Sequence, residues 1–102
     1  MDDSINVDVH PLAAAEIDEA DDWYEEVNPV VAERFRETVY AALKRIGQHP
    51  LEFPIVEESL RHCLPRGFPY VILFNDSAPR IRVIAVAHTR RRPGYWKDRI
   101  DA

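Results

Sequence analysis

The most constraining feature of this sequence is a pair of apolar stripes at helical spacing, separated by almost no linker. The first stripe runs through Ala13, Ile17, Ala20, Tyr24 and Val27, and the second through Ala32, Phe35, Val39, Ala42 and Ile46. Apolar residues spaced three and four apart lie on one face of a helix. Asn28 and Pro29 directly follow the first stripe, a good N-cap followed by a good first helical residue of the next helix. The sequence therefore predicts an antiparallel helical hairpin.

The ends of the two helices are marked as clearly as their apolar faces. Pro11 suits the first position of the first helix, and Gly47 and Pro50 end the second. The remaining face of the first helix carries acidic side chains that we expect to be solvated: Glu16, Asp18, Glu19, Asp21, Asp22, Glu25 and Glu26. Trp23 and Tyr24 lie at the inner edge of this helix, and we expect both to serve the core.

Segments on either side of the hairpin have the patterns of strands. These are residues 5–9, 60–64, 69–75 and 80–88. Residues 69–75 form a nearly continuous apolar run, which is typical of a central strand buried on both faces. A turn-forming cluster at 75–79 predicts that this strand and the next pair as an antiparallel hairpin. Residues 49–59 are predicted to be a loop with apolar anchors.

This order predicts an α+β fold with elements β-α-α-β-β-β in a single domain of residues 1–102. The helical hairpin should cover one face of a mostly antiparallel sheet. The other face is left to solvent or to a partner, and would carry some of the arginines. A final segment, residues 93–100, is predicted to form a short helical turn.

Composition excludes several classes of protein. A 46% hydrophobic content excludes global disorder, and a lone Cys63 excludes a disulfide scaffold or a cysteine-based zinc module. The sequence shows neither a signal peptide nor an apolar run long enough to cross a membrane, which predicts a cytoplasmic protein without a membrane partner. His10, His49 and His62 lack metal-ligand spacing and are interpreted as structural. Phosphate-loop and dinucleotide motifs are absent too, so neither a metal nor a cofactor is predicted.

The net charge of −5 conceals a strong asymmetry between the two parts of the chain. Residues 1–60 hold 15 acidic and 4 basic side chains, whereas residues 61–102 hold 3 acidic and 9 basic ones. Such an asymmetry indicates that one part of the surface meets an anionic partner.

The densest basic segment directly follows the last predicted strand and is interleaved with aromatic residues. It contains His88, Arg90, Arg91, Arg92, Tyr95 and Trp96. Arginines beside aromatic rings fit RNA or a phosphate-rich partner; the alternative is a solvated charge run whose aromatics pack on the sheet edge. His88 is either a general acid–base or a strand-end histidine bonded to the backbone. Arg61, Arg66 and Arg82 either converge on this segment or pair with acids across strands.

The order of these features resembles the RelE/ParE toxin superfamily, over about residues 5–100. The segments that carry the resemblance are Ala14-Ala15-Glu16-Ile17-Asp18-Glu19-Ala20, Trp23-Tyr24, Ala32-Glu33-Arg34-Phe35, His49-Pro50, Phe53-Pro54, Phe68-Pro69-Tyr70-Val71-Ile72, Val86-Ala87-His88, Arg91-Arg92-Pro93 and Trp96. The pattern is most similar to the ParE-like, plasmid-stabilisation branch. The resemblance implies the toxin of a type II toxin–antitoxin pair, neutralised by a cognate antitoxin whose C-terminal segment folds onto it.

The resemblance is compatible with two kinds of cellular target. ParE-like toxins poison DNA gyrase, whereas RelE-like toxins cleave mRNA in the ribosomal A site with sheet arginines and a C-terminal Tyr or His. The positions that match the nuclease set are Arg61, Arg82, His88 and Tyr95. This chain lacks a clear Glu or Lys base on its strands, and Thr89 rather than an aromatic residue follows His88, which favours gyrase and a non-enzymatic action.

The alternatives are a ribosome-dependent endoribonuclease and a non-toxic relative that only binds an antitoxin. The residues predicted to bind the target or the antitoxin are Arg61, Arg66, Arg82, Arg90, Arg91, Arg92, Tyr95 and Trp96.

Overall fold

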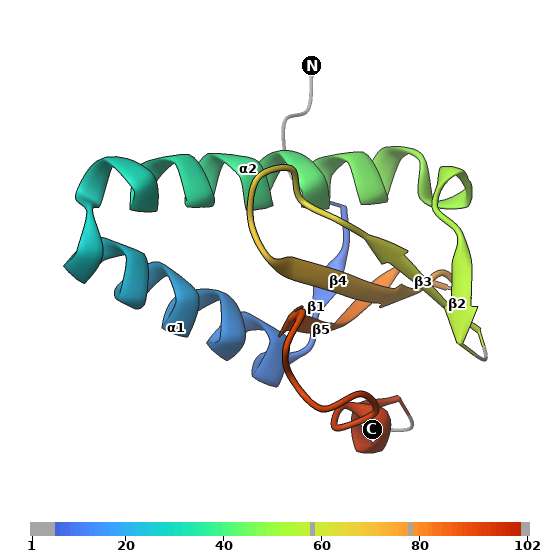
Figure 1. Cartoon of the computed structure of the whole chain (residues 1–102). Coiled ribbons are helices and arrows are strands. Elements are labelled where there is room, and N and C mark those ends of the chain that lie inside the picture. Colours follow the sequence, from blue (N-terminus) through green and yellow to red (C-terminus); the bar gives the residue numbers. More distant parts are fainter. Residues whose placement is uncertain (1–5, 58, 78, 101–102) are drawn as a thin grey trace.

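The predicted helical hairpin is confirmed in the computed structural model, which describes residues 6–57, 59–77 and 79–100. Helix α1 (Pro11–Val27) and helix α2 (Pro29–Gln48) lie antiparallel, with α2 spanning the top of the molecule in Figure 1. Asn28 caps α2 as expected, because its Oδ1 accepts a hydrogen bond from the Val30 N–H at 3.0 Å. His10 caps α1 in the same way, through its Nδ1 and the Leu12 N–H.

A five-stranded sheet lies beside the hairpin, in the order β1-β5-β4-β3-β2. The strands are β1 (Asp8–Val9), β2 (Ile55–Glu57), β3 (Leu60–Cys63), β4 (Tyr70–Asn75) and β5 (Arg82–His88). Strand β1 pairs in parallel with β5, and every other pairing is antiparallel. The α+β class and its order are confirmed, with β2 added at one edge. Of the predicted first strand, residue 5 lies outside the described residues.

Strand β2 corrects the prediction of a loop over residues 49–59. All three of its residues are exposed, so no alternation of buried and exposed positions marked it in the sequence. A 3-10 turn (Pro50–Glu52) precedes it. Among the described residues of this segment, Phe53 alone is a buried apolar anchor, against Phe74 of β4.

The main core lies between the hairpin and the sheet. Phe35 and Ile46 of α2 are fully buried against Phe74 and Val83 of the central strands. Tyr24 packs on Phe35 as expected, with ring centroids 5.1 Å apart. The expectation for Trp23 was wrong: its side chain is 58% exposed, because it lies at the outer edge of α1.

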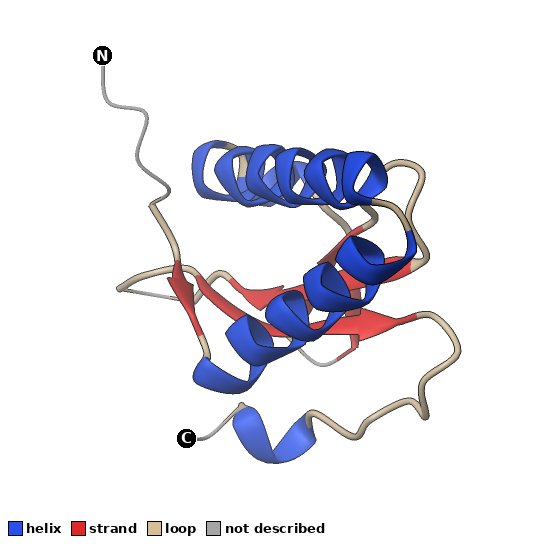
Figure 2. Cartoon of the chain, turned by 90° about the vertical axis from the view of Figure 1, so that its left-hand side faces the viewer, coloured by secondary structure: helices blue, strands red, loops and turns tan. Residues whose placement is uncertain are grey.

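A second core covers the opposite face of the sheet and corrects the expectation that this face is open. The C-terminal segment passes on the side of the sheet away from α2, as Figure 2 shows, and ends in a 3-10 turn (Lys97–Arg99). It places Trp96 against a small buried cluster that includes Leu60, Leu73 and Ile84. Burial of this indole stabilises the fold by roughly 2–3 kcal/mol, by its apolar area.

Candidate functional site

Glu16 lies at the centre of a buried polar cluster, which corrects its assignment to the solvated face of α1. Its carboxylate is 9% exposed and receives four hydrogen bonds. Arg99 donates two of them, at 2.9 and 3.1 Å, and Tyr95 donates a third through its hydroxyl at 2.6 Å. The fourth comes from the main-chain N–H of Val86 at 2.9 Å. The cluster therefore joins α1, β5 and the C-terminal segment.

The cluster provides main-chain hydrogen bonds that a neighbouring strand would otherwise make with β5. A bulge at Ile84 interrupts the pairing with β4, since Leu73 pairs with Ala85 and Phe74 with Val83. Strand β1 ends at Val9, so it does not continue along this part of β5. Arg99 donates to the Ile84 carbonyl at 3.1 Å while Glu16 accepts from Val86, and this satisfies two buried main-chain groups.

The protonation states of the cluster follow from its contacts. Burial alone would raise the pKa of Glu16, but the hydrogen bonds from Arg99, Tyr95 and Val86 outweigh it and lower the pKa below its usual value. Burial and the Glu16 hydrogen bond raise the pKa of the Tyr95 hydroxyl, so it stays protonated. The Tyr95 ring also lies 3.8 Å from the guanidinium carbon of Arg91, in a cation–π contact.

The residues that match the nuclease set are not brought together. Arg61 is held by the Asp76 carboxylate at 2.9 Å and the Phe53 carbonyl at 2.6 Å. Arg61 pairs in register with Phe74 and Arg82 with the next residue of β4, so the two arginines belong to opposite faces of the sheet. Arg82 and His88 begin and end β5, which separates them by about 20 Å at the usual rise per residue.

His88 is a strand-end histidine bonded to the backbone. Its Nδ1 accepts a hydrogen bond from the Arg90 N–H at 3.0 Å, and its ring meets Tyr70 edge-on at 5.3 Å. In the neutral ring the proton therefore sits on Nε2. The structure thus separates His88 from Arg61, and Tyr95 is engaged by Glu16.

The remaining predicted binding residues fall into two groups. Arg66, Arg90, Arg91 and Arg92 are exposed, on the β3–β4 loop and on the segment after β5. Of these, Arg91 pairs with Glu16 at 3.7 Å. Trp96 is buried in the second core and has little surface to offer a partner. In the segment after β5 the arginines are thus exposed, whereas the tryptophan packs on the sheet.

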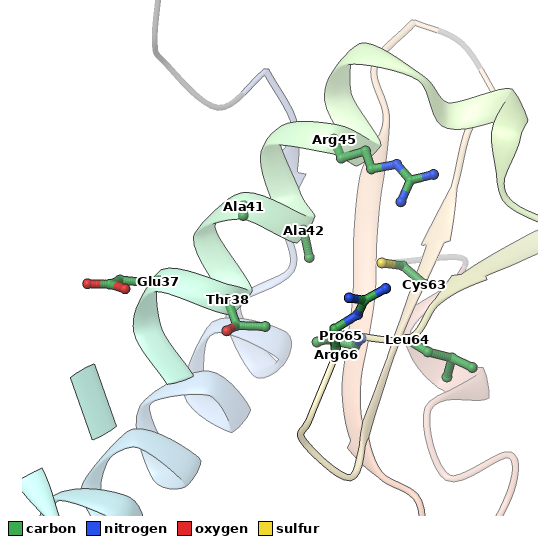
Figure 3. A pocket seen from close by; sticks show the side chains of 9 residues that line it. All are labelled: Glu37, Thr38, Ala41, Ala42, Arg45, Cys63, Leu64, Pro65 and Arg66. Carbon is green, nitrogen blue, oxygen red and sulfur yellow. The ribbon is translucent and has the colours of Figure 1, made fainter. Parts of the chain in front are cut away.

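A groove of about 450 Å³ lies between α2 and the end of β3, as Figure 3 shows. Small residues of α2 line one side, among them Thr38 and Ala42, and the buried thiol of Cys63 lies at the other. Burial raises the pKa of this thiol. Leu64 is 62% exposed at the rim. Arg45 and Arg66 approach the groove from α2 and from the β3–β4 loop (Figure 3).

Residues 6–57, 59–77 and 79–100 carry neither a metal-binding cluster nor a membrane-spanning helix. No group of three or more His, Cys, Asp or Glu side chains there is placed to hold a metal ion. Among the same residues, no helix has the length and apolar character needed to cross a membrane.

Comparison with solved structures identifies the fold. The chain is similar to a chain of the chromosomal ParDE TA system from P. aeruginosa, with a TM-score of 0.71 and 16% identity, covering 85% of this chain and 98% of that one. At this identity the likeness is one of fold. A comparison with curated protein sequences finds no significant match.

Comparison with protein families gives the membership. Residues 7–93 match the family described as the ParE toxin of the type II toxin–antitoxin system parDE, so the chain belongs to that family. Membership in a toxin–antitoxin family implies an antitoxin partner. The matched range ends before Tyr95, Trp96 and Arg99, which hold the C-terminal segment against the sheet.

Sequence reasoning missed four residues that shape these sites. Glu16 was one acid among many on its helix, and Arg99 was only one of nine bases. Arg45 lies in the last turn of α2, where the helix dipole favours a cation, so nothing in the sequence marked it as a groove residue. Leu64 stands between Cys63 and Pro65 at the end of a predicted strand, and nothing in the sequence marked it as exposed.

Proposed function

We propose that this protein is the toxin of a type II toxin–antitoxin pair and acts on DNA gyrase through protein contacts. The family membership supports the toxin role. The observation that favours gyrase over mRNA cleavage is the dispersal of the matching nuclease residues. Arg61 is engaged by Asp76, Tyr95 by Glu16, and His88 stands about 20 Å from Arg82 along one strand.

General acid–base catalysis of RNA cleavage requires its groups within hydrogen-bond reach of one reacting phosphate. Here the raised pKa of Tyr95 also makes its hydroxyl a poor base at neutral pH. A protein that blocks gyrase by contact needs no such assembly, only a complementary surface.

The direct test uses purified protein in two assays. In a supercoiling assay, we expect it to inhibit gyrase and to increase gyrase-dependent DNA cleavage. In a translation reaction, we expect ribosome-bound mRNA to stay intact. Cleavage of that mRNA, lost in Arg82→Ala and His88→Ala, would overturn the gyrase proposal and favour the endoribonuclease. Induction without any growth defect would instead favour a non-toxic antitoxin-binding relative.

We also propose that the groove between α2 and β3 receives a segment of the antitoxin. Its small side chains allow close approach, and the exposed Leu64 offers an apolar contact. Arg66 forms no ion pair with another described residue, so it is available to an acidic side chain. An acidic, apolar segment that folds on binding would complement this surface.

The variant Leu64→Glu tests the groove. It places a carboxylate at the apolar rim, and we expect the dissociation constant of the antitoxin to rise by about tenfold or more. Leu51→Glu is the matched control, because Leu51 is 74% exposed nearby and does not line the groove. Isothermal titration calorimetry measures both. Equal affinities for the two variants would place the antitoxin elsewhere.

A further inference from the structure

A pocket walled by aromatic rings lies beside helix α1, apart from the groove of Figure 3. Its volume is about 290 Å³, and it is lined by Trp23, Tyr24, Pro69, Tyr70 and His88. These residues come from α1, from the beginning of β4 with the residue before it, and from the end of β5. We call this cavity the ring pocket. None of its lining residues lines the groove.

The rings of the pocket are held in edge-on pairs. Trp23 and Tyr24 have their centroids 5.0 Å apart at an angle of 79°, and Tyr70 and His88 have theirs 5.3 Å apart at 80°. In such a pair the ring that offers its edge keeps both faces uncovered by its partner. Because the faces of aromatic rings carry partial negative charge, a pocket walled by them attracts a cation.

Three carboxylates accompany Trp23 on the exposed side of α1. Glu19, Asp22 and Glu26 are spaced three and four residues apart, so they form one stripe that includes Trp23. All three are exposed, and none forms an ion pair with another described residue. We call these three residues the acidic stripe. The Trp23 side chain is itself 58% exposed, so a cation above its ring would lie within one helical turn of the stripe.

Glu19 connects the acidic stripe to the ring pocket. A neighbouring cavity of about 160 Å³ is lined by Glu19 and by three residues of the ring pocket, Trp23, Tyr70 and His88. Burial raises the pKa of the Tyr70 hydroxyl, and the charges of Tyr24 and Glu19 raise it further. The negative charge of Glu19 therefore acts directly on the rings.

Arg91 reaches the neighbouring cavity, but its charge is already engaged. Its guanidinium lies 3.7 Å from the Glu16 carboxylate, and its guanidinium carbon lies 3.8 Å from the centre of the Tyr95 ring. Among the described residues, neither an arginine nor a lysine lines the ring pocket itself. The pocket thus has the surroundings of a cation site without a cationic side chain of its own chain in it.

The sign of the charge selects the occupant. Helix α1 carries seven acidic side chains and no basic one, so it would repel a nucleic acid or an acidic protein segment. The groove between α2 and β3 presents Arg45 and Arg66 instead, and is proposed to receive an acidic segment. The two surfaces therefore demand partner segments of opposite charge.

The length of the stripe indicates more than one positive charge. Glu19 and Glu26 are seven residues apart, which is about 10 Å along a helix. An extended segment places alternate side chains on one side at intervals of about 7 Å. Two basic side chains of one segment would therefore fit within the stripe and the pocket together.

We propose that the ring pocket and the acidic stripe bind basic side chains of an extended segment of a partner protein. One arginine or lysine side chain lies against the rings, and a second meets carboxylates along α1. This inference goes beyond the proposed function, because it does not depend on which protein the toxin inhibits.

The first test uses nuclear magnetic resonance with blocked amino acids as probes. The chain has two tryptophans, and Trp96 is buried, so the indole N–H signal of Trp23 reports on the pocket and that of Trp96 is the internal reference. The methylamides of N-acetyl-arginine and N-acetyl-lysine should shift the Trp23 signal saturably and leave Trp96 unchanged. The glutamate and leucine derivatives should shift neither. An equal shift of Trp23 by either of these two would overturn the inference.

Paired variants separate the local charge from the net charge. Glu19→Gln with Asp22→Asn removes two charges of the stripe, whereas Glu33→Gln with Asp98→Asn removes two exposed acidic side chains elsewhere. The first pair should raise the dissociation constant of the arginine probe by about tenfold, and the second should leave it within about twofold. Equal losses in the two pairs would reduce the binding to net charge and overturn the site.

Substitution of Trp23 tests the contribution of the ring. Trp23→Leu keeps an apolar side chain but removes the aromatic face, so the dissociation constant should rise about fivefold, followed through the main-chain N–H signals of Tyr70 and His88. Trp23→Phe keeps a ring and should lose less. Thermal unfolding checks that both variants fold. Unchanged binding by Trp23→Leu would show that the ring contributes nothing, contrary to the proposal.

A peptide distinguishes a protein segment from a small organic cation. Acetyl-Arg-Ala-Arg-amide should bind about tenfold tighter than the single arginine derivative, because its second side chain binds as part of the same molecule. A single derivative that binds as tightly as the peptide would assign the pocket to a small cation and overturn the assignment to a protein. None of these measurements involves gyrase or the antitoxin, so their failure would leave the proposed function standing.

Discussion

Two clusters of charge hold helix α1 to the rest of the molecule, with similar chemistry in different surroundings. On its inner side Glu16 meets Arg99, and both side chains are about nine-tenths buried. On its outer side Asp21 and Glu25 meet Arg36 of α2, whose side chain is 47% exposed. Each cluster joins an arginine distant in sequence to carboxylates of the same helix.

The difference shows that burial rather than contact distance decides how much such a cluster contributes to the stability of the fold. In the inner cluster the charges have lost water, and every lone pair depends on a protein donor. The main-chain groups of Ile84 and Val86 depend on it too. In the outer cluster water replaces any contact that breaks, so little free energy depends on the pair.

The substitution Glu16→Ala is the strongest test of the difference between the two clusters. The substitution leaves Arg99 buried without a counter-charge and removes the acceptor of the Val86 N–H. We expect the free energy of unfolding to fall by about 3–5 kcal/mol, measured by urea denaturation. Glu19→Ala, one turn along the same helix and exposed, is the control and should change it little. Equal losses in the two variants would contradict the role assigned to the cluster.

A smaller loss is expected from Tyr95→Phe, which removes one hydroxyl from the inner cluster. Glu16 Oε2 loses a 2.6 Å hydrogen bond but keeps Arg99, so we expect a loss of about 1 kcal/mol. Tyr24→Phe provides the comparison, because its ring packs on Phe35 and its hydroxyl bonds to no described residue. Urea denaturation of both should separate them. A Tyr95→Phe protein as stable as Tyr24→Phe would show that the hydroxyl is dispensable.

Local sequence signals predicted most of the fold. The hairpin followed from spacing and from Asn28-Pro29, and strands β3, β4 and β5 from short apolar runs and a turn cluster. These signals operate within a few residues. Strand β2 was missed because its residues are all exposed, and the covered second face because Trp96 and Ile100 carry no periodic pattern.

The candidate sites depend on contacts that no local signal encodes. Arg99 lies 83 residues from Glu16, and nothing in either neighbourhood marks the pair. The separation of Arg61 from Arg82 follows from strand register, which residue types alone did not determine. Trp23 lies next to the apolar stripe of α1. A shift of one residue along a helix is enough to move a side chain from the core to the surface.

The two clusters should also differ in their response to acid. The lowered pKa of Glu16 means that its contribution to stability is complete above about pH 4.5 and is lost as the pH falls through the folded-state pKa. Glu16→Gln removes this titration. Urea denaturation from neutral to acidic pH should therefore show a shallower loss in the variant than in the unmutated protein. Parallel curves would contradict the assignment of the lowered pKa to Glu16.

His10 provides a check on the same titration, because its contribution to the stability of the fold is lost in a higher pH range. Burial and the nearby Arg82 and Arg99 lower its pKa, so its contribution is complete above about pH 6.5 and declines below that value. Both the unmutated protein and Glu16→Gln retain His10. The difference between their curves should therefore open only in the acidic range where Glu16 titrates.

The smallest effect is expected from Arg36→Ala in the outer cluster. Its contacts with Asp21 and Glu25 are exposed, so the thermal unfolding midpoint should stay within measurement error and any difference should vanish in about 1 M salt. Arg99→Ala should lower the midpoint strongly at both salt concentrations, because burial shields the inner cluster from ions. If Arg36→Ala were as damaging as Arg99→Ala, exposure would not be the property that separates the two clusters. The geometry of the arginine contacts would then have to explain the stability of α1.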